Sequence, residues 1–229
     1  MNSHLSIVKE RLRKACERSG RSLRDVSLIA VSKTWPTENV KKVISEGHTT
    51  FGENKVQELE VKYRELPHNI EWHFIGRLQR NKVRKVLQYS PWIHSVDSVK
   101  LLEAIARISG EEGKQTNLFI QVNVDAEQSK NGFSPSAGLD DAIQLASSLE
   151  NINLAGLMCI PMPRNDVTEI RDNFKSFREL RDSLEHSTGV PLPYLSMGMS
   201  KDFEIAIEES ATHVRVGSAI FGKRTYSQP

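Results

Sequence analysis

One lysine stands at the end of an apolar, strand-prone segment. Residues 28–31 are all apolar, and Ser32, Lys33 and Thr34 follow before Pro36 breaks the segment. We expect Lys33 at the carboxyl end of this strand. A lysine taken by itself in such a place reaches solvent through its aliphatic stem. A partly buried amine near another cation has a second use, because it is nucleophilic enough to form an imine with an aldehyde.

Two turns of small residues lie far downstream. Residues 196–200 and 217–222 are rich in serine and glycine and lead into expected helices. Backbone N–H groups, hydroxyls and the positive end of a helix then converge on a phosphate group. Ser200 and Ser218 stand where helix caps are expected, and capping alone explains either turn taken singly. Two matching turns favour a phosphate site.

Arg215 precedes the second turn, in the expected strand 213–216. If Val214 and Val216 face the helices, Arg215 points into the interior, where an unpaired guanidinium is costly. One interpretation is an ion pair with an inward carboxylate such as Glu53, and the other is a donor to a ligand. Lysine, phosphate cradle and arginine together describe a pyridoxal phosphate site, with Arg215 towards the pyridine nitrogen.

Strands and helices alternate along the chain. An amphipathic helix with Leu5, Val8, Leu12 and Ala15 on one face comes first. The strands that we expect are 28–33, 49–52, 71–76, 92–96, 117–124, 154–159, 194–197 and 213–216. The helices that we expect between them are 37–46, 55–65, 79–88, 99–109, 139–149, 167–184 and 201–208.

This alternation predicts parallel strands, because parallel neighbours need a crossover and a helix is the usual one. The expected fold class is α/β, a single (β/α)8 TIM-type barrel with an extra N-terminal helix, and residues 1–229 form one domain. An open doubly wound sheet is the alternative, but its nucleotide-binding form needs a glycine-rich turn where this chain has Lys33 and Pro36. The longest connection, 125–138, is expected to be functional or mobile.

Composition limits the classes of function. The chain has 31 basic and 29 acidic residues, a net charge of +2, so we expect no nucleic acid partner. Two distant cysteines fit a reduced, cytoplasmic protein, and no apolar run is long enough to span a membrane. No metal site is expected, and His73 and Cys159 are read as core residues. The basic residues near 77–85 are read as a solvated face with the capacity to bind an acidic partner.

Five motifs in order resemble the YggS/PROSC family of pyridoxal phosphate homeostasis proteins. They are residues 31–34, 51–58, 72–82, 196–200 and 214–222. The resemblance implies a barrel similar to the amino-terminal domain of alanine racemase, and it makes Lys33 the imine lysine. It also implies the following cofactor-binding residues: Asn54 near the ring, Arg215 at the ring nitrogen, and Ser196, Ser200, Gly217 and Ser218 around the phosphate. Ser218 stands where threonine is usual in the family, and Trp35 and Lys55 occupy variable positions.

The resemblance implies a cytoplasmic protein that holds pyridoxal 5′-phosphate as a Schiff base and buffers or carries it, without robust turnover. Racemisation needs acid/base groups on both faces of the substrate carbon. No tyrosine (Tyr63, Tyr89, Tyr194 or Tyr226) lies in a strand-end motif, and the chain ends seven residues after Gly222. We therefore assign no catalytic residue and expect a monomer whose partners are apoenzymes that accept the cofactor. The alternatives are an amino-acid racemase and a regulatory module that uses the cofactor as a signal.

Overall fold

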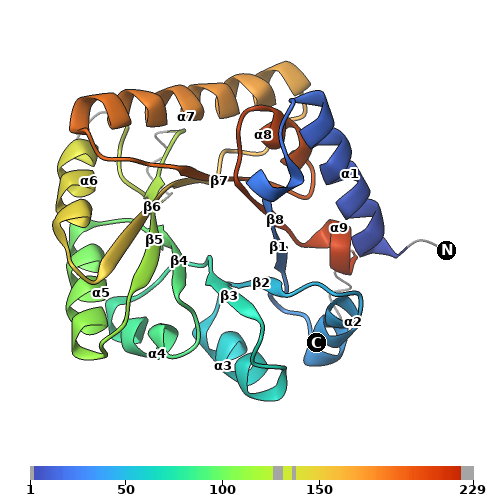
Figure 1. Cartoon of the computed structure of the whole chain (residues 1–229), viewed down its shortest axis with the longest axis horizontal. Helices are drawn as coiled ribbons and strands as arrows, with labels where there is room; N and C mark the ends of the chain where they lie inside the picture. The colour runs from blue at the N-terminus through green and yellow to red at the C-terminus, as the bar shows by residue number, and fades with distance from the viewer. Residues whose placement is uncertain (1–2, 126–130, 136–137, 223–229) are drawn as a thin grey trace.

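The computed structural model describes residues 3–125, 131–135 and 138–222, and its eight parallel strands form a closed barrel in chain order (Figure 1). The strands are β1 Ser27–Val31, β2 Thr50–Glu53, β3 Glu71–Phe74, β4 Trp92–Val96, β5 Thr116–Val122, β6 Ile152–Cys159, β7 Tyr194–Met199 and β8 His213–Val216. The barrel closes between β1 and β8, from the pair Ser27 and His213 to the pair Ala30 and Val216. The predicted fold class is confirmed.

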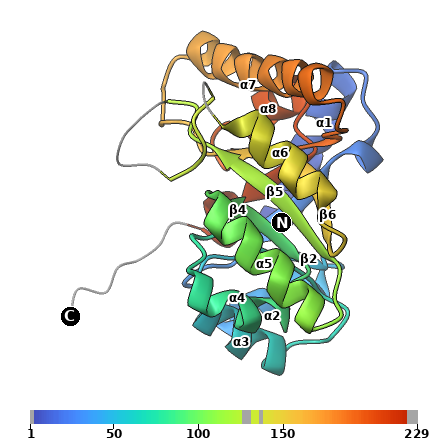
Figure 2. The same cartoon turned by 90° about the vertical axis from the view of Figure 1, so that its left-hand side faces the viewer.

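Helices form a ring outside the strands because each presents one apolar face to them. They are α1 His4–Arg18, α2 Thr37–Ser45, α3 Val56–Glu65, α4 Val83–Leu87, α5 Val99–Glu111, α6 Leu139–Ser148, α7 Val167–Thr188, α8 Phe203–Glu208 and α9 Ser218–Phe221. Two 3-10 turns, η1 Leu23–Asp25 and η2 Arg80–Lys82, complete the described elements. In Figure 2, α5 and α6 lie beside the paired strands β5 and β6.

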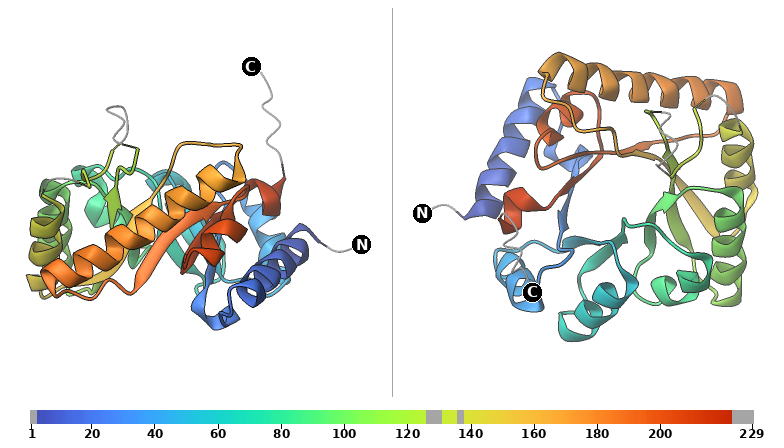
Figure 3. Two further views of the ribbon diagram at one scale, coloured as in Figure 1. Left: turned by 90° about the horizontal axis from the view of Figure 1, so that it is seen from above. Right: turned by 180° about the vertical axis from the view of Figure 1, so that it is seen from behind.

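The amino-terminal helix α1 contacts α8 and α9, so the start and the end of the described chain pack together. Figure 3 shows the long helix α7, drawn in orange, along the side of the barrel, where it contacts α6 and α8. The Asp166 side chain caps α7 by accepting the N–H groups of Thr168 and Glu169 at 2.8 and 3.0 Å. Gly189, at a φ of 69°, ends this helix four residues beyond the expected boundary.

Several expected boundaries are wrong. The first strand ends at Val31 and not at residue 33, because the chain turns at Ser32. The expected helix 79–88 is η2 followed by α4, and both η1 and α9 are additional short elements. The connection 125–138 falls partly outside the described residues.

Gly156 lets β6 approach the backbone of β7 at Tyr194 more closely than a residue with a side chain would allow. It lies in β6 with a φ of 150°, and a Cβ there would be 1.9 Å from the carbonyl oxygen of Tyr194. The pairing of β6 with β7 starts at these two residues. The barrel therefore depends on a glycine at this position.

We predict that Gly156→Ala lowers the free energy of unfolding by roughly 2–5 kcal/mol, from backbone strain plus overpacking. Urea denaturation measures this loss. Gly113→Ala is the matched control, because Gly113 also has a positive φ (62°) but has no heavy atom within 4 Å of the added Cβ. Equal losses in the two variants would contradict the close-approach argument.

Candidate functional site

Lys33 lies in a β-turn just beyond the carboxyl end of β1. The N–H of Trp35 donates to the carbonyl of Ser32 at 3.0 Å, and Thr34 has a φ of 67°. A positive φ at the third position is the geometry of a type II turn, and it is strained for a β-branched residue. The Lys33 side chain is half-buried. The turn therefore holds the amine at the rim of the barrel and keeps it partly out of water.

A buried ion pair lies beneath this turn. Glu53, the last residue of β2, is fully buried, and Lys62 of α3 is 4% exposed. The Lys62 ammonium contacts Glu53 Oε1 and donates to the Ser32 carbonyl at 2.8 Å. The Ser32 hydroxyl donates to the same Glu53 oxygen at 2.6 Å. Burial raises the pKa of Glu53, and the neighbouring Lys62 charge opposes that shift.

A second carboxylate, Glu58 of α3, also supports the turn that contains Lys33. Glu58 accepts the backbone N–H of Thr34 at 2.5 Å, and it also pairs with the Lys62 ammonium at 3.9 Å and the Lys55 ammonium at 3.6 Å. The strained residue of the turn is thus anchored by the same helix that supplies the buried lysine. Residues of β2 and α3 fix the position of Lys33.

The alternative partner suggested for Arg215 is therefore wrong, because Glu53 pairs with Lys62. Arg215 is 5% exposed and donates to Ser196 Oγ at 2.5 Å and to the carbonyl of Cys159 at 2.9 Å. Within the described ranges no carboxylate lies at ion-pair distance from Arg215, and the Asp202 charge acts on it only at longer range. Burial lowers the pKa of the guanidinium and raises that of the Cys159 thiol to about 12. An interior cation with only neutral protein partners is suited to a ligand acceptor.

The turns after β7 and β8 are joined by a serine. Ser200 Oγ accepts the N–H groups of Gly217 and Ala219 at 3.1 and 3.3 Å. The expectation that Ser200 and Ser218 occupy cap positions is wrong, because Asp202 and Gly217 are the residues that precede α8 and α9. Strand β7 runs on to Met199, which shifts the start of α8. Ser218 is exposed at the rim.

Two glycines let these turns approach their neighbours. Gly198 has a φ of 90°, and a Cβ there would be 2.6 Å from the Cβ of Ala206 in α8. A Cβ at Gly217 would be 3.3 Å from the Val31 carbonyl at the end of β1. The turn after β8 thus lies against the strand that leads to Lys33. The carboxyl ends of the neighbouring strands β7, β8, β1 and β2 bring the predicted residues to one face.

Asn54 follows β2 at this face. Its Oδ1 atom is buried and has no hydrogen-bond donor within reach among residues 3–125, 131–135 and 138–222. A buried carbonyl oxygen without a donor costs free energy, so this position fits a ligand that donates here. The backbone of Asn54 is fixed by Gly76, where a Cβ would be 2.1 Å from the Asn54 carbonyl oxygen.

Ser196 lies deeper than the other predicted phosphate residues. It is fully buried in β7, and its hydroxyl contacts both Arg215 and the Nδ1 atom of His94 at 2.8 Å. The structure brings Ser196 to Arg215, whereas Ser200 and Gly217 meet at the rim. The prediction that groups Ser196 with the phosphate turns stays untested.

The sequence reasoning missed a chain of polar side chains through the barrel. We call it the relay, and its members are Glu71, His73, His94, Ser196 and Arg215. His73 contacts Glu71 at 3.0 Å and His94 at 2.8 Å. A signal was present, because His73, His94, Ser196 and Arg215 are each the third residue of a strand, a position that faces inward in all four.

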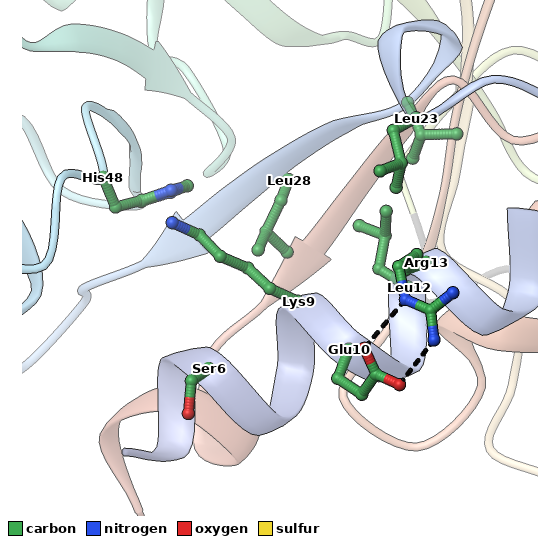
Figure 4. Close-up of a pocket in the computed structure, with 9 residues that line it drawn as sticks. Ser6, Lys9, Glu10, Leu12, Arg13, Leu23, Leu28 and His48 are labelled. Carbon is green, nitrogen blue, oxygen red and sulfur yellow. Dashed lines mark hydrogen bonds and ion pairs between the residues drawn. The ribbon is translucent and has the colours of Figure 1, made fainter. Parts of the chain in front are cut away.

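A separate hollow of about 460 Å³ lies at the amino end of β1, between α1 and η1 (Figure 4). Figure 4 shows Lys9 extending towards His48 and Glu10 paired with Arg13. Burial lowers the pKa of His48 to about 4. Val26 and Leu28 line this hollow, and they lie at the opposite end of β1 from Lys33. The hollow is therefore distinct from the candidate site.

The described residues contain neither a metal-binding cluster nor a membrane-spanning helix. Residues 3–125, 131–135 and 138–222 contain no group of three or more His, Cys, Asp or Glu side chains arranged to hold a metal ion. No helix within those ranges is long and apolar enough to cross a membrane.

The chain is similar to proteins of one family over nearly its whole length. The family described as "Alanine racemase, N-terminal domain" matches residues 4–225. A protein of Aquifex aeolicus named "Pyridoxal phosphate homeostasis protein" is 43% identical over 223 residues, 97% of this chain and 97% of that protein.

Solved structures give the same result. PipY of Synechococcus elongatus, solved with pyridoxal phosphate bound, is 36% identical, with a TM-score of 0.82 over 94% of this chain and 100% of that chain. A diaminopimelate decarboxylase from M. jannaschii has a TM-score of 0.76 at 15% identity over 95% of this chain and 60% of that chain, a likeness of fold alone.

We predict that Lys62→Met destabilises the protein by about 3–5 kcal/mol, because it leaves the Glu53 carboxylate buried without its cation. Urea denaturation of the variant at neutral pH measures the change. Adding Glu53→Gln removes the orphaned charge while keeping an acceptor for Ser32, so the double variant should recover most of the loss. A cost below about 1 kcal/mol for the single variant would contradict the paired arrangement.

The buried histidines inside the barrel make the stability of the folded protein dependent on pH. Burial lowers the pKa of His213 to about 3 and also lowers the pKa values of His73 and His94. An unfolded histidine has a pKa of about 6.5. Between these values the unfolded chain binds the proton and the folded chain does not. Stability is therefore complete above about pH 6.5 and falls as pH drops towards 3.

We predict that each such histidine contributes up to ~1.4 kcal/mol per pH unit to this loss. Urea unfolding at several pH values gives the slope. His213→Gln should flatten it by up to that amount relative to the unaltered chain. Identical slopes would show that His213 is protonated equally in both states.

Proposed function

Because the chain belongs to the family of pyridoxal phosphate homeostasis proteins, within the alanine racemase amino-terminal domain family, we propose that it binds pyridoxal 5′-phosphate and contributes to its homeostasis. The observation that carries this is the convergence of Lys33, Arg215 and the two serine–glycine turns at one end of the barrel. The PLP-bound structure of PipY, 36% identical over 94% of this chain, supports it. When bound, the cofactor supplies an aldehyde, a phosphate dianion and a pyridine ring.

Lys33 is the residue that binds the aldehyde covalently, as a Schiff base. Its turn is held from below by Ser32, which is fixed by Glu53 and Lys62. Lys33 is half-buried, so its side chain is held partly out of bulk water.

The turns after β7 and β8 hold the phosphate. Ser200 already fixes the backbone of Gly217 and Ala219, and Ser218 presents an exposed hydroxyl beside them. This geometry gives Ser200 a positioning part, in which it sets the direction of the amide groups. Phosphate oxygens then take the place of Ser200 Oγ as acceptors of these two N–H groups, and the Ser218 hydroxyl also donates to the phosphate.

Arg215 and Asn54 face the ring. The guanidinium has only neutral protein partners in the described chain, Ser196 Oγ and the Cys159 carbonyl, and it donates to the pyridine nitrogen. Asn54, whose Oδ1 is buried without a donor in the described chain, contacts the ring or its substituents. Ser196 orients Arg215 in this arrangement and lies below the phosphate.

This site favours holding the cofactor over using it. An arginine at the pyridine nitrogen discourages protonation of the ring and so weakens it as an electron sink. Tyr63 and Tyr89 pack against each other at 5.0 Å, and Tyr194 lies at the amino end of β7, so these tyrosines are placed away from Lys33. We assign a carrier or buffer function in the cytoplasm, as a monomer that supplies apoenzymes. A racemase of the alanine racemase class is the alternative, and incorporation of solvent deuterium into alanine would favour it.

We predict that the purified protein with added pyridoxal phosphate shows the absorbance band of a protein-bound imine, and that Lys33→Ala abolishes it. Lys55→Ala is the matched control, because Lys55 lies near the same face and its side chain is 68% exposed. It should retain the band. An unchanged band in Lys33→Ala would reject Lys33 as the binding lysine.

A further inference from the structure

The proposed function uses only two members of the relay, Arg215 and Ser196, which lie nearest the candidate site. The remaining members extend to the opposite end of the barrel. Glu71 is the first residue of β3, and its side chain is 50% exposed at the amino-end rim. His73 and His94 are fully buried between it and Ser196. A polar path thus crosses the barrel interior from a surface carboxylate to the arginine of the candidate site.

The chemistry of the two ends fixes the direction of every hydrogen bond in the path. A guanidinium only donates, so Ser196 Oγ accepts from Arg215. An ionised carboxylate only accepts, and hydrogen bonds from His73 and Trp92 hold the pKa of Glu71 below its usual range. Therefore His73 carries its proton on Nε2 and donates to Glu71.

The middle of the path follows from these ends. His73 Nδ1 is then an acceptor, so His94 donates from Nε2 across the 2.8 Å contact. His94 Nδ1 is free to accept from the Ser196 hydroxyl, also at 2.8 Å. Both rings are neutral in this arrangement. The opposite direction would place a lone pair of His73 Nε2 against the Glu71 carboxylate, which is unfavourable.

Within the described chain, aromatic rings surround the two histidines of the path. Trp92 stacks on His73 with ring centroids 5.1 Å apart, and Phe119 stacks on His94 at 4.3 Å. His213 packs edge-on against His94 at 5.9 Å, but its Nδ1 atom bonds to the Thr212 hydroxyl. These rings exclude water, so a change of direction at one member must pass to the next.

We propose that Glu71 is a positioning residue for Arg215, acting through His73, His94 and Ser196 from the opposite end of the barrel. The oriented relay presents a free lone pair of Ser196 to the guanidinium and so holds Arg215 in place. If the relay reverses, His94 donates to Ser196 Oγ, which then accepts from both His94 and Arg215 while its own proton loses its acceptor, and this weakens the bond to Arg215. The effect on cofactor binding rests on the proposed function of Arg215, whereas the direction of the relay does not.

The test uses two substitutions of Glu71 with opposite hydrogen-bonding character. Glu71→Lys replaces the acceptor with a donor, which forces the relay to reverse. Glu71→Gln keeps an acceptor oxygen and should preserve the direction. Glu150→Lys is the charge control, because Glu150 is an exposed carboxylate in the turn that enters β6 at the same end of the barrel.

Two-bond ¹H–¹⁵N spectra of the cofactor-free protein report which ring nitrogen carries the proton. We expect Nε2–H in His73 and His94 for the unaltered chain, Glu71→Gln and Glu150→Lys, and Nδ1–H in both rings for Glu71→Lys. Unchanged rings in Glu71→Lys would overturn the proposal. A merely structural loss at Glu71 would not move the proton of His94, which Glu71 does not touch.

Titration with pyridoxal phosphate tests the link to Arg215. We expect Glu71→Lys to raise the dissociation constant roughly three- to tenfold relative to Glu150→Lys, the effect of weakening one hydrogen bond to a charged group. Equal constants in the two variants would overturn the positioning of Arg215 by Glu71. If the unaltered chain bound no pyridoxal phosphate, the proposed function would fail, and the ring-proton result would still decide the relay.

Discussion

The candidate site depends on one buried ion pair, between Glu53 of β2 and Lys62 of α3. Neither charge reaches solvent, so each is tolerable only because the other is present. Their shared contacts with the hydroxyl and carbonyl of Ser32 fix the residue that precedes Lys33. A helix outside the barrel thereby determines where the reactive amine lies. The strained φ of 67° at Thr34 persists because Glu58, from the same helix, holds its N–H group.

Two polar systems thus end at the same face of the barrel: the Glu53–Lys62 pair joins β2 to α3, and the relay crosses the barrel interior. The Glu53–Lys62 pair holds the Lys33 turn from the side, and the relay reaches Arg215 from below. In both, a charged group is held by hydrogen bonds in a water-excluded place, where such bonds are strong and a missing partner is costly. A face with a fixed amine, a fixed guanidinium and amides oriented by Ser200 is preorganised for a phosphorylated aldehyde.

Much of the fold follows from the sequence, because hydrophobic periodicity and strand–helix alternation are local signals. The order of eight strands and the closed barrel were predictable, as was the place of Lys33, Arg215 and the two turns at one end. What failed was long-range pairing between polar groups. The sequence analysis singled out neither Lys62 nor His94, and it read His73 as an isolated core residue, because only the fold places Lys62 against Glu53 and His73 against His94. The expected end of β1 is two residues too late, because the chain turns at Ser32. The Ser32 N–H still donates to the Gly52 carbonyl after the strand has ended.

The central claim is that Lys33 carries the cofactor. The most direct measurement is peptide mapping by mass spectrometry after the protein, loaded with pyridoxal phosphate, is reduced with borohydride. The account predicts one phosphopyridoxyl group per chain, on the peptide that contains Lys33. A modification spread over exposed lysines such as Lys55, or absent from the Lys33 peptide, would contradict it.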